Sequence, residues 1–570
     1  MSGQRLKLQF QRLYNHFSGD STETNLQDIS EVLFCTRRNV RMVINKMVDK
    51  GWVDWQPAVG RGKQSRLIFN NTDSELQLHH VRKLVADGKL EPALAALDNN
   101  AEKLVQLIQE QLGISHHQGK QIVRLPYYRS FENITPLKPL RRSEQHLVRQ
   151  IFSGLTQLKE EKGEEEAVIG DIAHSWEAIT PRHWRFYLRP AIRFHDGRLL
   201  DSNDIFATFA EVKQLALFAH IDKVLSPFIN IIDFHLSQDD YRFPDLLANT
   251  CAMIQPANHA TLSDYETFPI GTGPYKVTVN DKQRFKLEAF EHYFGFRALS
   301  DVVEVWILNN FAACYLQPTL GDKLEQHVHI SSRLSMDQGC TFLLLNRISG
   351  LAQEPQWLHY FQSRLYSLNV MREMDLTQVG DFNLFNAYGL LPGWIHTQQL
   401  PQSVVIPHKK VVTLAYQYEH PIYPYVASLI EKILMKDGIQ LNIMELSYED
   451  IVLGQQAENI DIWLNGMSLG SNRCDAILAW LHNFDHIERV MPSCEFKQLQ
   501  LAISEWRSVA NAKFPSDIIG ETLSQTGQII PLFHNWLGVD NNVQLQGMES
   551  NLLGWFDFKA VWSKPLISSC

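Results

Sequence analysis

The feature that most constrains this chain is a pattern of two short helices, a turn and a hairpin within residues 26–69. The first helix is expected to open with a capping box formed by Thr24 and Gln27, and Phe34–Cys35 makes the turn. In the second helix, apolar residues recur at i, i+3, i+4 and i+7, the spacing of one buried stripe: Val40, Val43, Ile44 and Met47. The pattern predicts a helix-turn-helix over residues 26–45.

The second helix carries polar and cationic residues roughly opposite this apolar stripe. Thr36 can cap its N-terminus, and Arg37 lies in its first turn. Recognition helices reach base edges and phosphates with such side chains. The candidate DNA-contacting residues of this helix are therefore Thr36, Arg37, Arg38, Arg41 and Asn45.

A basic hairpin follows the two helices. Residues 52–56 and 65–69 alternate as strands do, which predicts a wing over residues 52–69. Its cations, Arg61, Lys63 and Arg66, suit a phosphate backbone. A charge cluster can be only a solvated face, but the two helices together with a basic hairpin favour a winged helix-turn-helix DNA-binding domain over residues 1–72.

Charge is unevenly distributed along the 570 residues. The formal net charge is -10, yet residues 1–69 hold eleven Lys or Arg against six Asp or Glu. The N-terminal region therefore carries about +5 and the remainder about -15. This asymmetry is typical of a specific DNA-binding module joined to a domain with another role.

The sequence also predicts a soluble, cytoplasmic protein without metal or cofactor. Residues 1–14 lack the apolar core and cleavage site of a signal peptide, and no stretch reaches the roughly 18–20 apolar residues that span a bilayer. The seven cysteines form no C-x-x-C pair, which favours reduced thiols. His79–His80, His116–His117 and His327–His329 lack the partners of a metal motif.

Residues 73–120 are predicted to form a helical connector, with leucines and valines recurring up to Gly113. Two interpretations stay open for its apolar residues. They can pack within one chain, or they can join two copies in a homodimer.

From residue 121 onward the chain resembles the extracytoplasmic binding proteins for oligopeptides and related solutes. The matching phrases are residues 171–177, 184–189, 192–197, 202–205 and 269–275. Within the last phrase, Gly271 and Gly273 are expected to serve the backbone path rather than a phosphate loop, since the third glycine of a dinucleotide fingerprint is missing.

The combination of this region with an N-terminal winged helix is similar to the SgrR family of bacterial transcriptional regulators. Phrases typical of that family are Arg61–Lys63, Arg141–His146, Gln150–Ser153, Tyr388–Pro392 and Leu553–Lys559. The family also has a paralogous YbaE type, and these phrases do not separate the two. The resemblance implies a response to sugar-phosphate stress, in which the regulator activates a small-RNA gene and represses its own.

The resemblance further implies a multidomain α/β (α+β) chain whose solute-binding part, residues 121–570, has two lobes. Lobe I is expected at about 121–338 plus 530–570, and lobe II at about 339–529. A hinge between them would let a solute favour the closed state.

A small solute, with a sugar phosphate as the favoured candidate, is expected between the lobes. Peptide binders of this kind hold the ligand's amino group with an aspartate after a strand, whereas no aspartate occurs here between Asn465 and Cys474. Aromatic faces suit sugar rings, and arginine pairs with phosphate. The candidate ligand residues are Tyr127, Tyr128, Arg129, Trp394, Trp463 and Asn465.

Two other functions fit parts of the sequence. One is a transport-type solute- or peptide-binding protein, which the missing signal peptide and the recognition helix disfavour. The other is a serine hydrolase, because Gly466–Gly470 matches G-x-S-x-G around Ser468, with Asp485 and His534 following in the order of a triad. The chain lacks the alternating strands and helices and the oxyanion loop of such enzymes, so no catalysis is expected.

Overall fold

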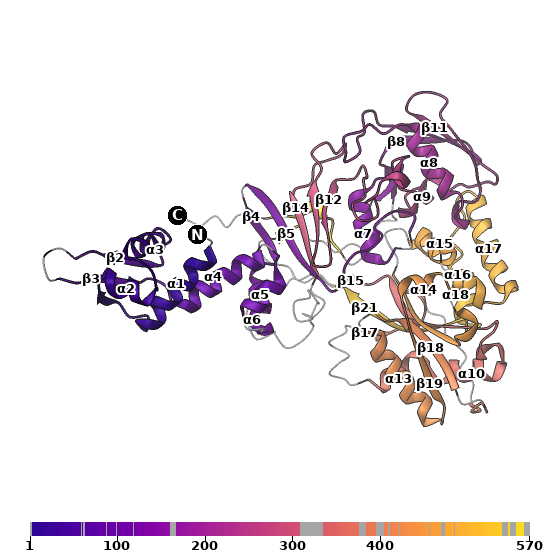
Figure 1. Ribbon diagram of the computed structural model, residues 1–570. Coiled ribbons are helices and arrows are strands. Elements are labelled where there is room, and N and C mark those ends of the chain that lie inside the picture. Colours follow the sequence, from indigo (N-terminus) through magenta and orange to yellow (C-terminus); the bar gives the residue numbers. More distant parts are fainter. Residues whose placement is uncertain are drawn as a thin grey trace, which may run out of the picture. The chain divides into compact units, whose positions relative to one another are not determined.

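The computed structural model describes residues 3–563 except 59, 61–62, 87, 98–99, 118, 139, 160–166, 308–334, 375–383, 395–403, 409–410, 421, 455, 469–472, 484, 538–544 and 548–554. The chain divides into two compact units between Leu112 and Gly113. Each is described below by itself (Figure 1). Among the described residues, no helix combines the length and apolar character needed to cross a membrane.

The first part of the N-terminal unit is the predicted winged helix-turn-helix. Its elements are α1 (Gly3–His16), β1 (Thr22–Thr24), α2 (Leu26–Val32), α3 (Arg37–Asp49), β2 (Val53–Gln56) and β3 (Ser65–Phe69). The three strands form an antiparallel sheet in the order β1-β3-β2. The stripe predicted on α3 is buried at all four positions, against α1, α2 and the sheet.

Two details of this unit differ from the sequence prediction. The cap of α2 is Asn25, whose Oδ1 accepts hydrogen bonds from the backbone N–H groups of Gln27 (2.8 Å) and Asp28 (3.1 Å). Thr24 instead pairs with Ser65 in β1, so the Thr24–Gln27 capping box is wrong by one residue. The sequence prediction also omitted α1, which supplies Leu6, Phe10 and Leu13 to the core.

Three further helices complete this unit. They are α4 (Asp73–Ala86), α5 (Leu90–Ala96) and α6 (Ala101–Gln111). Their apolar residues Val81, Val85, Leu104 and Ile108 are fully buried within the chain. Residues 113–117, expected in this connector, instead form strand β4, which pairs with β5 in the second unit.

The second unit begins with a five-stranded sheet in the order β12-β13-β14-β5-β4. Its strands are β4 (Gly113–His117), β5 (Lys120–Tyr127), β12 (Tyr275–Asn280), β13 (Arg284–Ala289) and β14 (Val302–Ile307). Helix α7 (Arg142–Ile151) buries Leu147, Val148 and Ile151 in the same core. We call this sheet, together with the elements between β5 and β14, lobe I.

Lobe I also contains a four-stranded sheet in the order β10-β11-β9-β8. Its strands are β8 (Ala173–Thr180), β9 (His183–Leu188), β10 (Ile221–Leu225) and β11 (Ile231–Leu236), accompanied by β6 (Thr156–Lys159), β7 (Ala167–Gly170), α8 (Ser202–Val212) and α9 (Phe243–Leu246). A Cβ atom on Gly271 or Gly273 would lie 2.1 Å or 2.5 Å from the backbone of Ile151. These glycines therefore serve close backbone packing, as the sequence predicted.

Lobe II is built on a seven-stranded sheet in the order β15-β21-β16-β20-β18-β19, with β17 beside β21. The strands are β15 (Ser335–Met336), β16 (Gly339–Leu345), β17 (Leu384–Asn386), β18 (Val411–Gln417), β19 (Gln440–Leu446), β20 (Ile462–Ser468) and β21 (Ile529–Leu537). Helices α10 (Pro355–Arg364), α11 (Ser367–Arg372) and α13 (Tyr423–Lys436) pack on one face.

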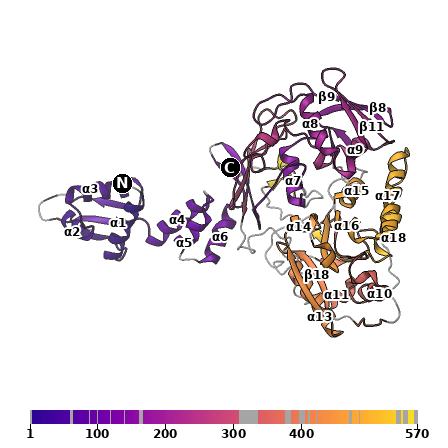
Figure 2. The ribbon, with the colours of Figure 1, turned by 45° about the vertical axis from the view of Figure 1, so that its right-hand side comes forward.

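The other face of this sheet packs against a second set of helices, which is shown with the first set in Figure 2. These are α15 (Arg473–Asn483), α16 (Asp485–Val490), α17 (Ser493–Ser508) and α18 (Ser516–Ser524), and α14 (Tyr448–Val452) lies on the same side. The core on this face also includes the four-stranded sheet of lobe I.

Both boundaries between the lobes differ from the expected ones. Lobe II already includes β15, which pairs with β21, so Asp337 belongs to lobe II rather than to lobe I. The chain also returns to lobe I later than expected. Lobe I was expected to resume at residue 530, but β21 pairs with β16 and β17 and so belongs to lobe II as far as Leu537. After β22 (Leu545–Gln546), residues 555–563 run through a short helical turn to β23 (Trp562–Ser563). Phe556, Phe558 and Val561 are buried in the core of lobe I.

Candidate functional site

The exposed face of α3 is the first candidate site. Thr36 caps the helix by accepting a hydrogen bond from the backbone N–H of Asn39 (3.4 Å). Arg38, Arg41 and Asn45 are exposed at i, i+3 and i+7, which places them on one side of the helix. None of the three has a hydrogen bond or ion pair with a described residue. This stripe is free to contact a partner.

Arg37 is also exposed but makes one contact that these three residues lack. Its Nε donates a hydrogen bond to the Gln27 side chain (2.6 Å), which joins the start of α3 to α2. This hydrogen bond is exposed to solvent.

The wing residues are only partly described. Lys63 is exposed, whereas Arg61 lies outside the described residues. Arg66 is exposed on β3, opposite Glu23 of β1 and Gln56 of β2. Because the next residue, Leu67, faces the core, Arg66 lies on the outer face of the sheet.

A polar cluster between the two lobes is the second candidate site. On the lobe I side, Arg129 makes two hydrogen bonds to Glu144 of α7, one of them of 2.8 Å. Both charges lie in lobe I and both side chains are largely buried. Arg129 was predicted to contact an anionic solute, but its charge is already matched by Glu144.

Tyr127 is part of the lobe I core rather than of an open surface. Its ring stacks on Phe131 with the centroids 4.8 Å apart, and its hydroxyl lies 2.5 Å from Ser143 Oγ. Tyr128 lies beside Arg129, whose Nε donates to its hydroxyl (3.4 Å). Burial raises the pKa of Tyr423 in lobe II, and the nearby Tyr128 adds to this shift.

Two adjacent arginines at the start of α7 reach lobe II directly. Arg141 Nη2 lies 2.9 Å from Glu419 Oε1, and Arg142 Nη1 lies 2.9 Å from Asp337 Oδ2. The Arg141 guanidinium also lies over the Tyr448 ring, 4.8 Å from its centroid. The sequence prediction missed these residues, although a pair of cations at a helix start was a visible signal.

His420 and Tyr423 lie on the lobe II side of the same cluster. Their rings stack with centroids 3.7 Å apart. Burial, together with the charges of Arg142, Arg141 and Arg129, lowers the pKa of His420 to about 3. His420 is therefore neutral, and its solvent-shielded Nδ1 has no hydrogen-bond partner among the described residues.

The remaining predicted ligand residues lie on or near β20. Trp463 and Asn465 share one face of this strand, and Trp394 packs against the same core. Asn465 Oδ1 accepts a hydrogen bond from Gly466 N–H (2.8 Å), while its Nδ2 is shielded without a described partner. A Cβ on the next residue, Gly466, would point to the other face of β20 and lie 2.7 Å from the Tyr423 hydroxyl.

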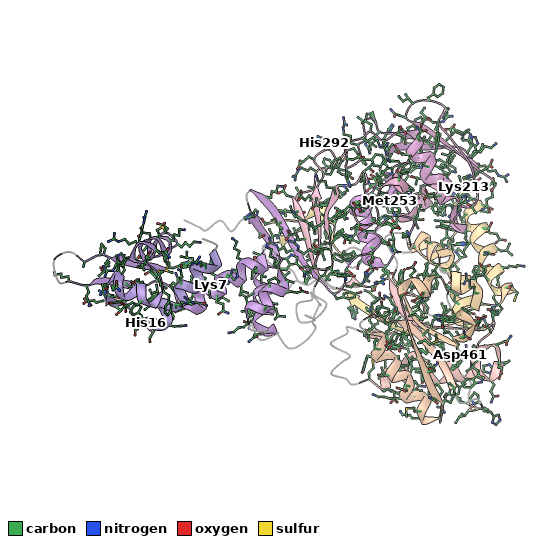
Figure 3. The ribbon with its side chains drawn as sticks, viewed as in Figure 1. Lys7, His16, Lys213, Met253, His292 and Asp461 are labelled. Carbon is green, nitrogen blue, oxygen red and sulfur yellow. The ribbon has the colours of Figure 1, made fainter. Side chains whose placement is uncertain are left out.

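Asp461, which precedes β20 and is labelled in Figure 3, has a structural role. Its carboxylate accepts hydrogen bonds from the backbone N–H groups of Thr413 (2.9 Å) and Leu351 (2.8 Å). This aspartate is thus unavailable to a ligand's amino group. At the other end of β20, Ser468 pairs with Gly339 within the sheet.

Comparison with known sequences decides the family. The profile described as "Sugar transport-related sRNA regulator N-term" matches residues 5–119, and that of bacterial extracellular solute-binding proteins, family 5, matches residues 167–317. The HTH-type transcriptional regulator SgrR of Pectobacterium atrosepticum is 38% identical, covering 99% of this chain and all of its own length. The chain belongs to the SgrR family.

A second SgrR, from Yersinia pseudotuberculosis, is 37% identical over 99% of this chain and its own full length. The match covers both units, so this SgrR-family chain is a DNA-binding transcriptional regulator with a solute-binding-type domain, and not an enzyme.

Solved structures support the fold of the second unit of this SgrR-family protein. The Escherichia coli murein tripeptide binding protein MppA has a TM-score of 0.63 at 16% identity, covering 78% of this chain and 98% of that one. The Helicobacter pylori protein DppA, in complex with the peptide STSA, has a TM-score of 0.66 at 14% identity and the same coverage. At these identities the likeness shows the two-lobed fold alone.

Proposed function

We propose that the N-terminal unit binds duplex DNA through α3, and that a small polar solute bound between the lobes changes this binding. The observation that carries the first part is the exposed stripe of Arg38, Arg41 and Asn45, opposite a fully buried stripe. Base contacts from such a stripe give specificity, while Lys63 and the wing position the protein on the phosphates.

A gel-shift titration of the full chain against its own promoter region tests the DNA contact. Arg38→Ala or Arg41→Ala should weaken binding to the specific site by about 1–3 kcal/mol. Lys213→Ala, which removes an exposed cation of the second unit (Figure 3), is the control and should bind as the wild type does. Equal binding by all four proteins would refute the assignment of α3.

For the solute, we propose a sugar phosphate held by the polar cluster between the lobes. Support comes from the aromatic and arginine side chains of the cluster and from Asp461, whose carboxylate is occupied by backbone amides. We propose Trp463, Asn465 and Trp394 as ligand residues on the lobe II side, where Trp463 and Trp394 pack in the same core, and Tyr128, which contacts Arg129, on the lobe I side.

Calorimetric titration with and without operator DNA tests the coupling. If the solute changes the affinity for DNA by some factor, DNA must change the affinity for the solute by the same factor. The absence of heat and of any thermal shift at millimolar sugar phosphate would refute direct sensing.

The remaining parts of the proposal concern location and assembly. We place the protein in the cytoplasm, because its DNA partner is there. A homodimer is proposed because regulators with one recognition helix per chain commonly read two half-sites. Analytical ultracentrifugation with and without DNA measures the assembly directly.

A further inference from the structure

Arg141 and Arg142 differ from the other arginine of the cluster between the lobes. Both come from the start of α7 in lobe I, and each is paired with a carboxylate of lobe II, Glu419 or Asp337. Arg129, by contrast, is matched by Glu144 within its own lobe. If the lobes move apart, the ion pairs of Arg141 and Arg142 break, whereas the pair of Arg129 with Glu144 is unaffected.

The side chains are also differently exposed. The Arg141 and Glu419 side chains are 21% and 25% exposed, and Arg142 is 32% exposed although its partner Asp337 is only 7% exposed. Arg129 is only 12% exposed and Glu144 5%. A solute can therefore reach the Arg141 and Arg142 side chains more easily than Arg129. Displacing Glu419 leaves a partly exposed carboxylate, whereas displacing Asp337 or Glu144 leaves a buried one, at higher cost.

The surroundings of the two arginines suit an anion with polar substituents. Tyr448 lies beneath Arg141, and His420, held neutral, has a shielded Nδ1 without a described hydrogen-bond partner. Guanidinium groups bind phosphate through paired N–H donors, which gives both strength and orientation.

We propose that Arg141 and Arg142 bind the anionic group of the solute, and that Glu419 and Asp337 occupy them until it arrives. The proposal rests on the proposed function and deepens it by naming the residues and the charge class. The two carboxylates imitate the ligand's charge, so the solute binds by displacing them. They thereby lower the affinity for the anion and keep the lobes bridged in its absence.

Neutralising the two carboxylates tests the proposal, because the proposal requires the affinity for the anion to rise rather than fall. The double variant Glu419→Gln/Asp337→Asn should bind glucose 6-phosphate at least about tenfold more tightly than the wild type by calorimetry, because a competing charge is removed. Arg141→Ala should bind it at least about tenfold more weakly. If the carboxylates were ordinary structural partners, their loss would weaken binding or leave it unchanged.

Two controls accompany this test. Glu373→Gln removes a lobe II carboxylate from a surface pair with Lys436 and should leave the affinity unchanged. Glucose and inorganic phosphate are titrated in parallel, and a melting curve for each variant establishes that it is folded.

The outcomes separate this inference from the proposed function. Binding of glucose 6-phosphate by the wild type, without tighter binding by the double variant, overturns the inference and leaves solute sensing intact. Equal affinity for glucose and glucose 6-phosphate overturns it as well, since the anion would then contribute nothing. If neither the wild type nor the double variant binds glucose 6-phosphate at millimolar concentration, both proposals fall.

Discussion

Arg507 of α17 donates a hydrogen bond to the carboxylate of Asp240, and only 7% and 1% of these two side chains remain exposed. Asp240 lies just after β11 in lobe I, so the ion pair joins the two lobes. His220 Nε2 lies 3.1 Å from the same carboxylate, and the backbone N–H of Arg242 donates to it (2.9 Å). A hydrophobic core shared by the four-stranded sheet and helices α15–α18 surrounds this pair.

Asp240→Asn should destabilise the second unit by about 3–5 kcal/mol, because the substitution leaves the buried Arg507 charge without its partner. Urea denaturation followed by tryptophan fluorescence measures the change. The neighbouring Asp239 is a matched control: its pair with Arg182 is 41% and 59% exposed, so Asp239→Asn should cost about 0–1 kcal/mol. Equal losses for the two variants would contradict a special role for the buried pair.

His195 should make the stability of the second unit depend on pH. Its Nδ1 accepts a hydrogen bond from Gly271 N–H (3.3 Å), and its Nε2 faces the Gly273 carbonyl (3.0 Å), which fixes the neutral form with the proton on Nε2. Burial lowers the pKa of His195 to about 4, although the bond to Gly273 acts in the opposite direction. Between pH 6.5 and about 4, His195 is therefore protonated in the unfolded chain but neutral in the folded protein.

Stability should accordingly fall as the pH drops through this window, by up to about 1.4 kcal/mol per pH unit for this one group. His195→Gln should remove that part of the slope, whereas replacement of the exposed His174 by Gln should not. Unfolding free energies at intervals between pH 7.5 and 4.5 provide the measurement. A wild-type slope retained in His195→Gln would assign the effect to other groups.

Gly273→Ala should destabilise lobe I by about 1–3 kcal/mol or more, because the new methyl group would collide with the Ile151 backbone. Gly197→Ala is the comparison: its φ of +92° is unfavourable for alanine, but no atom lies within 4 Å of the added carbon. We expect a loss of about 1 kcal/mol there from backbone strain alone. Thermal melting of the two variants gives the difference, and a smaller loss at Gly273 than at Gly197 would refute the collision.

Lys63→Ala should weaken binding to specific and non-specific DNA by the same factor, since a phosphate contact carries no base information. The slope of log affinity against log salt concentration should decrease by about 1. Arg41→Ala should instead reduce the preference for the specific site. Salt-dependent fluorescence anisotropy with both kinds of duplex distinguishes the two effects, and loss of specificity in Lys63→Ala would reverse the assignment.

The sequence predicted the parts of the fold that depend on local periodicity. The buried stripe of α3 and the strand at Ser65–Phe69 are found at the predicted residues. Helix α1 was missed although its core residues Leu6, Phe10 and Leu13 recur at i, i+4 and i+7, the spacing of an amphipathic helix.

The candidate ligand site could be predicted only in part, because its polar contacts join residues far apart in the chain. Arg129 looked available in sequence, but Glu144 takes its charge in the folded protein. The pairs of Arg141 with Glu419 and of Arg142 with Asp337 cross between the lobes, and no local pattern indicates which acid meets which arginine. The position of β21 likewise depended on its pairing with β16 rather than on its own apolar residues.

The burial of Phe556, Phe558 and Val561 in lobe I has a consequence for the order of synthesis. The hydroxyl of Tyr275 donates a hydrogen bond to the Phe558 carbonyl (2.9 Å), so this last segment closes a core begun more than 400 residues earlier at β5. At roughly 5–20 residues per second, the ribosome needs on the order of half a minute or more to supply it. The DNA-binding unit is complete long before then. Each newly made regulator therefore passes through a stage in which its DNA-reading part is finished and its sensor is not.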